Sequence, residues 1–166
     1  MHVATLLIAL LLGTLQADDA KKKAVFERGI FKPSGPILFE PGTDKLKPES
    51  DALLGEVKEA LGDRAYVTLL RIEAHSDTDG DPASSQTLTE KRALAVARKL
   101  VSLGVDCKRL VPVGFGGTKP LAENTTPDGK AQNRRITFVA AALRGVLIGG
   151  MPADGGGKVA GDPCEK

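Results

Sequence analysis

The run from Tyr66 to Ala74 is rich in apolar and β-branched residues, and its second half alternates apolar with charged side chains. This pattern predicts a strand with one buried face. A polar loop follows, and Thr87 and Glu90 have the spacing of a capping box, so we expect a helix to begin near Leu88. Gly104 is a typical helix stop. A strand followed by a long helix must bury the apolar side of the helix against a sheet, which limits the chain to a layered fold.

Other segments continue the alternation of strands and helices. Strands are expected at 25–32, 35–40, 109–115 and 135–141, and a helix at 48–62. From this periodicity the fold class is α/β, a layered domain whose helices cover a sheet. At 166 residues the chain has room for one domain with a substantial core.

A positively charged residue, Arg92, lies inside the apolar stripe of the second helix, about 40° around the axis from Leu88. A guanidinium in that position needs a carboxylate partner, because its planar donor fork fits a carboxylate and buried charges are usually paired. The partner is Asp77, just past the end of the strand, a carboxylate on a ligand, or both at once. Spacing leaves two interpretations open, a structural ion pair of Asp77 with Arg92 or a site where both charges contact a ligand.

Five short motifs occur in order along the chain. They are IEAHSD at 72–77, LTEKRA at 88–93, GV at 104–105, VGFG at 113–116 and NRRI at 133–136. Together they resemble the OmpA-like peptidoglycan-binding domain over residues 30–142. That family includes periplasmic domains of outer-membrane proteins, peptidoglycan-associated lipoproteins and flagellar stator proteins. The resemblance implies an α+β sandwich with a mixed parallel and antiparallel sheet covered by helices.

The resemblance also assigns roles to residues of the site. In such domains the Asp after the strand binds the ammonium of meso-diaminopimelate in the peptidoglycan stem peptide, and an Arg fifteen residues later binds the carboxylate on the same carbon. These roles fall on Asp77 and Arg92. Secondary ligand contacts are expected at Thr78, Ser85, Asn133 and Arg134. The family often has Asn where Ser85 stands, and Arg134 is either a supporting group near the ligand or the partner of a core carboxylate.

The implied function is non-catalytic binding of peptidoglycan of the diaminopimelate type, which would anchor a periplasmic or outer-membrane-associated protein to the cell wall. No cofactor is expected, and other envelope proteins are expected as further partners. The alternative is a structural or protein-interaction module of the same fold that does not bind the wall. A net charge of +2 and few aromatic residues argue against a nucleic-acid partner.

Rival sites near the strand end have weak support. Asp77, Asp79 and Asp81 alternate as in a calcium loop, but Pro82 stands where such a loop requires Gly and Leu88 where it requires Glu. A cluster of Asp residues in a solvated turn explains this pattern.

A hydrolase or zinc site is not supported either. His75 is the one histidine after residue 17, and the chain has no Gly-x-Ser-x-Gly motif. We therefore expect no catalytic and no metal-ligating residue.

The two ends of the chain differ in composition from the expected domain. Residues 4–15 form an apolar segment too short to span a bilayer and of the length of a signal-peptide core. We expect a signal peptide at 1–17, a polar leader at 18–29, the domain at 30–142 and a Gly-rich flexible tail at 143–166, with export to the periplasm. In an exported chain Cys107 and Cys164 permit one disulfide, the alternative being that Cys164 pairs with another molecule.

Overall fold

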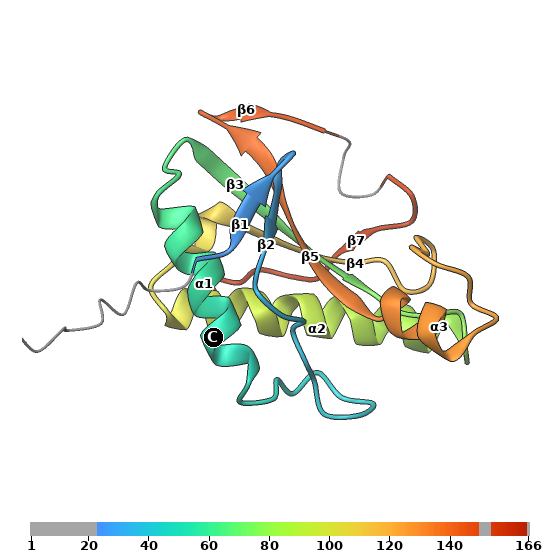
Figure 1. The fold of residues 1–166 in the computed structure, drawn as a ribbon. Helices are drawn as coiled ribbons and strands as arrows, with labels where there is room; N and C mark the ends of the chain where they lie inside the picture. The colour runs from blue at the N-terminus through green and yellow to red at the C-terminus, as the bar shows by residue number, and fades with distance from the viewer. Residues whose placement is uncertain (1–22, 150–153, 166) are drawn as a thin grey trace, which may run out of the picture.

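The computed structural model describes residues 23–149 and 154–165, so the expected signal peptide lies outside the described residues. Within them one sheet has the strand order β1-β2-β5-β3-β4-β7, and a further strand, β6, pairs with β5 (Figure 1). The strands are β1 (Val25–Glu27), β2 (Ile30–Lys32), β3 (Val67–His75), β4 (Leu110–Gly114), β5 (Arg135–Leu143), β6 (Val146–Leu147) and β7 (Lys158–Val159). The α-helices are α1 (Ser50–Gly62), α2 (Pro82–Ser102) and α3 (Pro127–Asn133), and a 3-10 turn, η1 (Cys107–Arg109), precedes β4.

Strand β3 is the centre of the sheet. It pairs in parallel with β4 and antiparallel with β5, which confirms the mixed sheet that the family resemblance implied. Side chains alternate along β3, so Leu70 and Ile72 point to one face and are fully buried, whereas Arg71 and Glu73 point to the other. No helix in the described residues is both long and apolar enough to cross a membrane.

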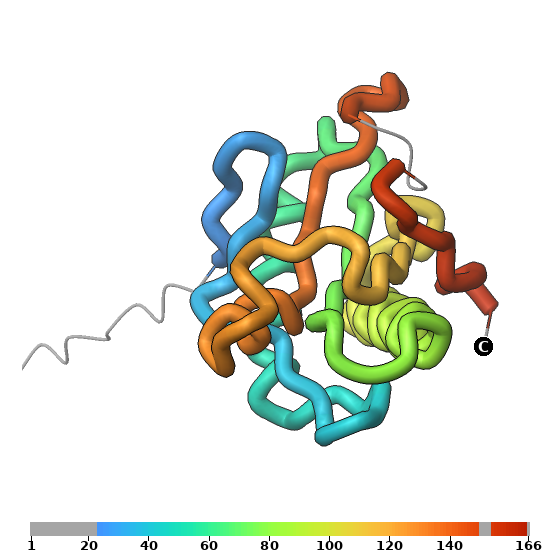
Figure 2. The backbone as a smooth tube through the Cα atoms, turned by 90° about the vertical axis from the view of Figure 1, so that its right-hand side faces the viewer, coloured from blue at the N-terminus to red at the C-terminus, as the bar shows by residue number. Residues whose placement is uncertain are grey.

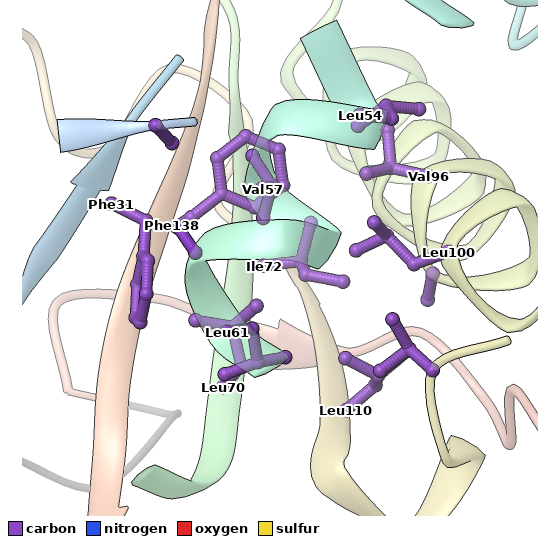
Figure 3. Close-up of a cluster of buried hydrophobic side chains, with 14 of the residues drawn as sticks. Phe31, Leu54, Val57, Leu61, Leu70, Ile72, Val96, Leu100, Leu110 and Phe138 are labelled. Carbon is purple, nitrogen blue, oxygen red and sulfur yellow. The ribbon is translucent and has the colours of Figure 1, made fainter. Parts of the chain in front are cut away.

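The hydrophobic core lies between the sheet and the two long helices (Figure 3). Its large, fully buried side chains come from β2, α1, β3, α2 and β5, which ties every layer to the same cluster. They include Phe31, Leu54, Val57, Leu61, Leu70, Ile72, Val96, Leu100 and Phe138. Removal of this apolar surface from water is the main force that holds the layers together.

Helix α2 begins earlier than its sequence pattern predicted. It starts at Pro82 and not near Leu88, because Asp81 caps it: Asp81 Oδ2 accepts a hydrogen bond from Ser84 N at 2.7 Å. Pro82 suits the first turn, where its missing N–H is not needed. The prediction of a capping box at Thr87 was therefore wrong. Thr87 lies inside the helix, and its hydroxyl donates to the Ala83 carbonyl one turn back.

Two further segments differ from expectation. The strand expected at 35–40 is not formed, and the one bridge in that region joins Phe39 to Leu46. Helix α3 was not predicted from the sequence. Its first turn is capped by Thr126, whose Oγ1 accepts from Gly129 N at 3.0 Å, and Pro127 occupies the first position.

The C-terminal segment follows the edge of the sheet at β4, beside α2 (Figure 2). Strand β7 pairs with β4, Ala160 N donates to the Pro112 carbonyl at 3.0 Å, and a disulfide joins Cys107 to Cys164. The described part of residues 143–166 thus contains two strands and a covalent link, in contrast to the flexible tail expected there. The strand expected at 25–32 is formed as two short paired strands, β1 and β2, and β1 lies inside the segment expected to be a polar leader.

Candidate functional site

The loop after β3 carries Asp77 and is fixed by the loop after β4. Ser76 N donates to the Gly116 carbonyl at 2.8 Å, and Gly117 approaches so closely that a Cβ there would lie 2.9 Å from the Asp77 carbonyl oxygen. Thr89, on α2, accepts a hydrogen bond from Gly116 N at 2.9 Å and joins the same assembly. Backbone contacts from two elements therefore fix the position of Asp77.

The Asp77 carboxylate contacts a cation, but the cation is not Arg92. Its Oδ2 forms an ion pair with the guanidinium of Arg134, and its Oδ1 accepts from Asp79 N at 3.2 Å. The Asp77 side chain is 12% exposed and that of Arg134 is 49% exposed. Arg134 lies between α3 and β5, so α3, which sequence analysis missed, is what delivers the partner of Asp77.

Arg92 is placed by a different part of the chain. Its Nε donates to the Thr43 carbonyl at 2.8 Å, and its guanidinium lies 4.8 Å from the centre of the Phe39 ring. Burial lowers the pKa of the Arg92 guanidinium, Asp44 opposes this effect, and the positive charge of Arg134 adds to it. Across 23–149 and 154–165 no carboxylate forms an ion pair with Arg92. A structural ion pair of Asp77 with Arg92 is therefore not formed.

Arg92 and Arg134 line one groove of about 1400 Å³. It passes from the Phe39 loop, between the segment after β2 and strand β5, to the face of the sheet that carries Glu73. Two guanidinium groups line this end of the groove, and among the described residues no carboxylate forms an ion pair with Arg92, so this end is favourable for an anionic group.

The remaining expected ligand contacts have local partners. Thr78 N donates to Asn124 Oδ1 at 3.3 Å, and Ser85 lies half-buried in the first turn of α2. Asn133 is fully buried; its Oδ1 accepts from two backbone amides of the loop before α3, at 2.6 and 2.9 Å. Its amide nitrogen donates to Asn124 Oδ1 at 2.9 Å. Asn133 therefore organises the loop that also contacts Thr78.

Sequence reasoning missed the residues that position Arg92. Phe39, Thr43 and Asp44 come from a loop far from α2 in the chain, and no periodicity marks them. The only signal was the Pro-Gly pair at 41–42, which indicates a turn without saying what the turn contacts.

The three Asp residues of the loop are engaged with other groups. Asp77 pairs with Arg134, Asp79 pairs with Lys130 at 2.8 Å, and Asp81 caps α2. The described residues contain no cluster of His, Cys, Asp or Glu able to hold a metal ion.

A charged cluster lies on the face of β3 that the long helices do not cover. Glu73 Oε1 accepts from Arg71 Nε at 2.7 Å, and Glu73 Oε2 lies 3.3 Å from His75 Nε2. The His75 ring stacks on Phe115 with centroids 5.0 Å apart. Burial raises the pKa of Glu73, but the contacts with His75 and Arg71 outweigh it and keep the pKa below its usual value. Burial lowers the pKa of His75.

Comparison with known proteins gives consistent results. The outer-membrane lipoprotein YfiB of Pseudomonas aeruginosa is 33% identical over 112 residues, which are 68% of this chain and 66% of that protein. The peptidoglycan-binding protein ArfA of Mycobacterium tuberculosis is 36% identical over 107 residues, 63% of this chain and 32% of that protein. The chain thus spans between a third and two thirds of these relatives.

Solved structures share the architecture. The crystal structure of the peptidoglycan-associated lipoprotein from Burkholderia pseudomallei superposes with a TM-score of 0.56 and 30% identity, and the match covers 65% of this chain and 89% of that one. The sequence profile described as OmpA family matches residues 38–134, a span that contains Asp77, Arg92 and Arg134. This chain therefore belongs to the OmpA family.

Proposed function

We propose that this chain is a non-catalytic module that binds peptidoglycan through the diaminopimelate head group of the stem peptide. Asp77 would contact the ammonium of that head group and Arg92 its carboxylate. Relatives with peptidoglycan in their names, and the absence of enzymes among the relatives described above, support the binding of peptidoglycan in general. The choice of diaminopimelate rests on the two residues of the site.

The observation that carries the proposal is the state of Arg92. It is a half-buried guanidinium in a groove, with a neighbouring cation and no carboxylate contact in the described residues. A half-buried guanidinium that forms no ion pair in the described residues is incompletely compensated, and a ligand carboxylate would supply the missing contact. An aromatic ring and a carbonyl already orient the guanidinium, so little ordering remains to be done on binding.

Asp77 supplies the opposite charge of the site. Its present partner, Arg134, is half-exposed and can move away into solvent, whereas the mostly buried Asp77 carboxylate needs a cation in its place. A ligand ammonium can take the place of Arg134 on Asp77, and Arg134 can then turn to the ligand carboxylate beside Arg92. Free amino-acid head groups carry both charges on one carbon, which matches this arrangement.

The affinity for a single stem peptide is expected to be modest. Charge-assisted hydrogen bonds contribute about 1.5–3 kcal/mol each, so two of them give dissociation constants of roughly tens of micromolar to several millimolar. Retention on the wall then depends on many closely spaced stems. We propose that the protein acts in the periplasm, exported by the segment at 1–17 and associated with the wall or outer membrane, where other envelope proteins are candidate partners.

The test compares purified sacculi of the diaminopimelate type with sacculi of the lysine type, which lack the second head group. We expect the wild type to sediment with the first and not with the second. Asp77→Ala and Arg92→Ala should each weaken binding about ten- to hundred-fold, the loss of one charge-assisted contact. Arg98→Ala is the matched control, since Arg98 is exposed on the same helix.

The competing function is a structural or interaction module that does not bind the wall. It predicts no sedimentation of the wild type with either kind of sacculus. Equal sedimentation with both kinds would also overturn the proposal, since it would show that the protein binds sacculi without recognising the diaminopimelate head group.

A further inference from the structure

The groove exists because the pairing of β2 with β5 stops early. Phe31 lies opposite Phe138, and continuing the register would place Pro33 opposite Ile136. Proline has no N–H to donate, so the ladder ends there and the chain diverges from β5. The Ala140 N–H donates to the Gly29 carbonyl, so it points towards the β2 side of β5. Backbone N–H groups along a strand alternate between its two edges, so the Ile136 N–H points to the β2 side as well. Within the described residues, β5 therefore has an open edge that faces the groove.

The lining of the groove is unbalanced in charge. The cations are Lys32, Arg71, Arg92, Lys119, Arg134 and Arg135, against the single carboxylate of Glu73. Three of these cations have carboxylate partners: Lys32 with Glu27, Arg71 with Glu73, and Arg134 with Asp77. In the part of the chain that the structure describes, Arg92, Arg135 and Lys119 form no ion pair. Arg92 is accounted for by the proposed head-group site. Arg135 donates to the Asn133 and Lys119 carbonyls and lies within reach of the charge of Glu73, whereas the ammonium of Lys119 contacts an aromatic ring.

Lys119 is fixed in its position on the groove. Its ammonium lies 4.2 Å from the centre of the Phe115 ring, and its backbone carbonyl accepts from Arg135 at 3.2 Å. On its other side runs Gly155, where any Cβ would overlap the Lys119 side chain. The Gly155 carbonyl in turn accepts from Thr118 Oγ1 at 2.8 Å. Lys119 therefore lies between an aromatic ring and the C-terminal segment, with Arg135 as its neighbour.

We propose that Lys119, with Arg135 beside it, binds a second carboxylate of the same ligand, so that the groove reads the stem peptide beyond its diaminopimelate head group. This inference rests on the proposed function. The residue that precedes diaminopimelate in the stem is a glutamate linked through its side chain, whose α-carboxylate is either free or amidated. The charge of the groove matches the free form, and Lys119 is a specificity-determining residue for it.

The test uses three soluble probes in calorimetric titration: free meso-diaminopimelate, the tripeptide alanyl-γ-glutamyl-diaminopimelate, and the same tripeptide with the glutamate α-carboxylate amidated. We expect the wild type to bind the free-acid tripeptide about ten-fold more tightly than the amidated one, a difference of about 1.4 kcal/mol. Lys119→Met keeps a side chain that packs on Phe115 but lacks the charge. It should lose the preference and bind free diaminopimelate as the wild type does.

Two variants and a control complete the experiment. Lys119→Arg should keep most of the preference, because the cation remains. Lys108→Met removes a lysine from η1, away from the groove, and should leave the preference unchanged. Equal binding of the two tripeptides by the wild type, or an undiminished preference in Lys119→Met, overturns this inference and leaves the proposed function standing. Failure of all three probes to bind the wild type overturns both.

Discussion

The two faces of the β3–β5 pair differ in role: one contributes to stability and the other lines the proposed binding groove. On the helix side, Ile72 and Phe138 are opposite each other and have no exposed surface. On the other side, Glu73 lies between Arg71 and His75, next to the groove. A packed apolar side chain has no partner that a ligand can replace, whereas an ion pair does. The comparison predicts that substitutions on the first face change folding and those on the second face change binding.

The largest expected effect is on the packed face. Phe138→Ala should reduce the free energy of unfolding by about 3–5 kcal/mol, because it leaves a large cavity between α1 and the sheet. Its neighbour Thr137 lines the groove and is partly exposed, so Thr137→Ala should cost no more than about 1 kcal/mol. Urea unfolding of the two variants measures the difference. Equal losses would mean that the two faces are not distinct in their contribution to stability.

A smaller effect is expected where the packed face meets the site. Gly114 ends β4 opposite Ala74, and a Cβ there would lie 2.7 and 2.8 Å from the Cγ and Cα atoms of Glu90 on α2. Gly114→Ala should therefore cost about 1–3 kcal/mol through overpacking. Gly55→Ala is the control, because a Cβ at that helical position meets nothing within 4 Å and alanine favours helix. An unchanged stability of Gly114→Ala would show that α2 can shift without cost near Asp77.

Most of the packed face could be predicted from the sequence, because periodicity reports burial directly. The strand ending in Leu70, Ile72 and Ala74 became β3, and the helix that contains Val96 and Leu100 became α2. The start of α2 was missed because the sequence offers two capping patterns, Asp81 before Pro82 and Thr87 with Glu90. Only the structure of the first turn shows that Asp81 is the residue that caps the helix. Strand β7 was missed because its two residues carry no period, and only its place beside β4 makes it a strand.

Less of the binding face could be predicted. The family resemblance pointed to Asp77 and Arg92, but it could not say that Asp77 pairs with Arg134 or that Thr43 and Phe39 place Arg92. These contacts join segments far apart in the sequence, and single charged residues have no pattern that indicates their partners. The opening beside β5 depends on one proline, whose effect is visible only once the register of β2 is known.

The charged face should also make stability depend on pH, and this is the smallest effect. Burial lowers the pKa of His75 from its usual value of 6.5, although Glu73 opposes the shift. The folded protein therefore takes up a proton less readily than the unfolded chain, so stability is fully present above pH 6.5 and declines as the pH falls towards the lowered pKa. The lowered pKa of Glu73 adds a second decline below its usual 4.5.

His75→Gln should remove the first decline, because it deletes the titrating imidazole, and it should weaken the second, because the His75 contact is the first of those that lower the pKa of Glu73 and only the Arg71 contact remains. Urea unfolding from about pH 7.5 down to about pH 5 measures the slope that His75 contributes. Phe138 carries no charge, so Phe138→Ala should lower the whole curve without changing its slope. A wild-type slope in His75→Gln would mean that the buried imidazole does not sense the charges around it, and the contrast between the two faces would then be one of packing alone.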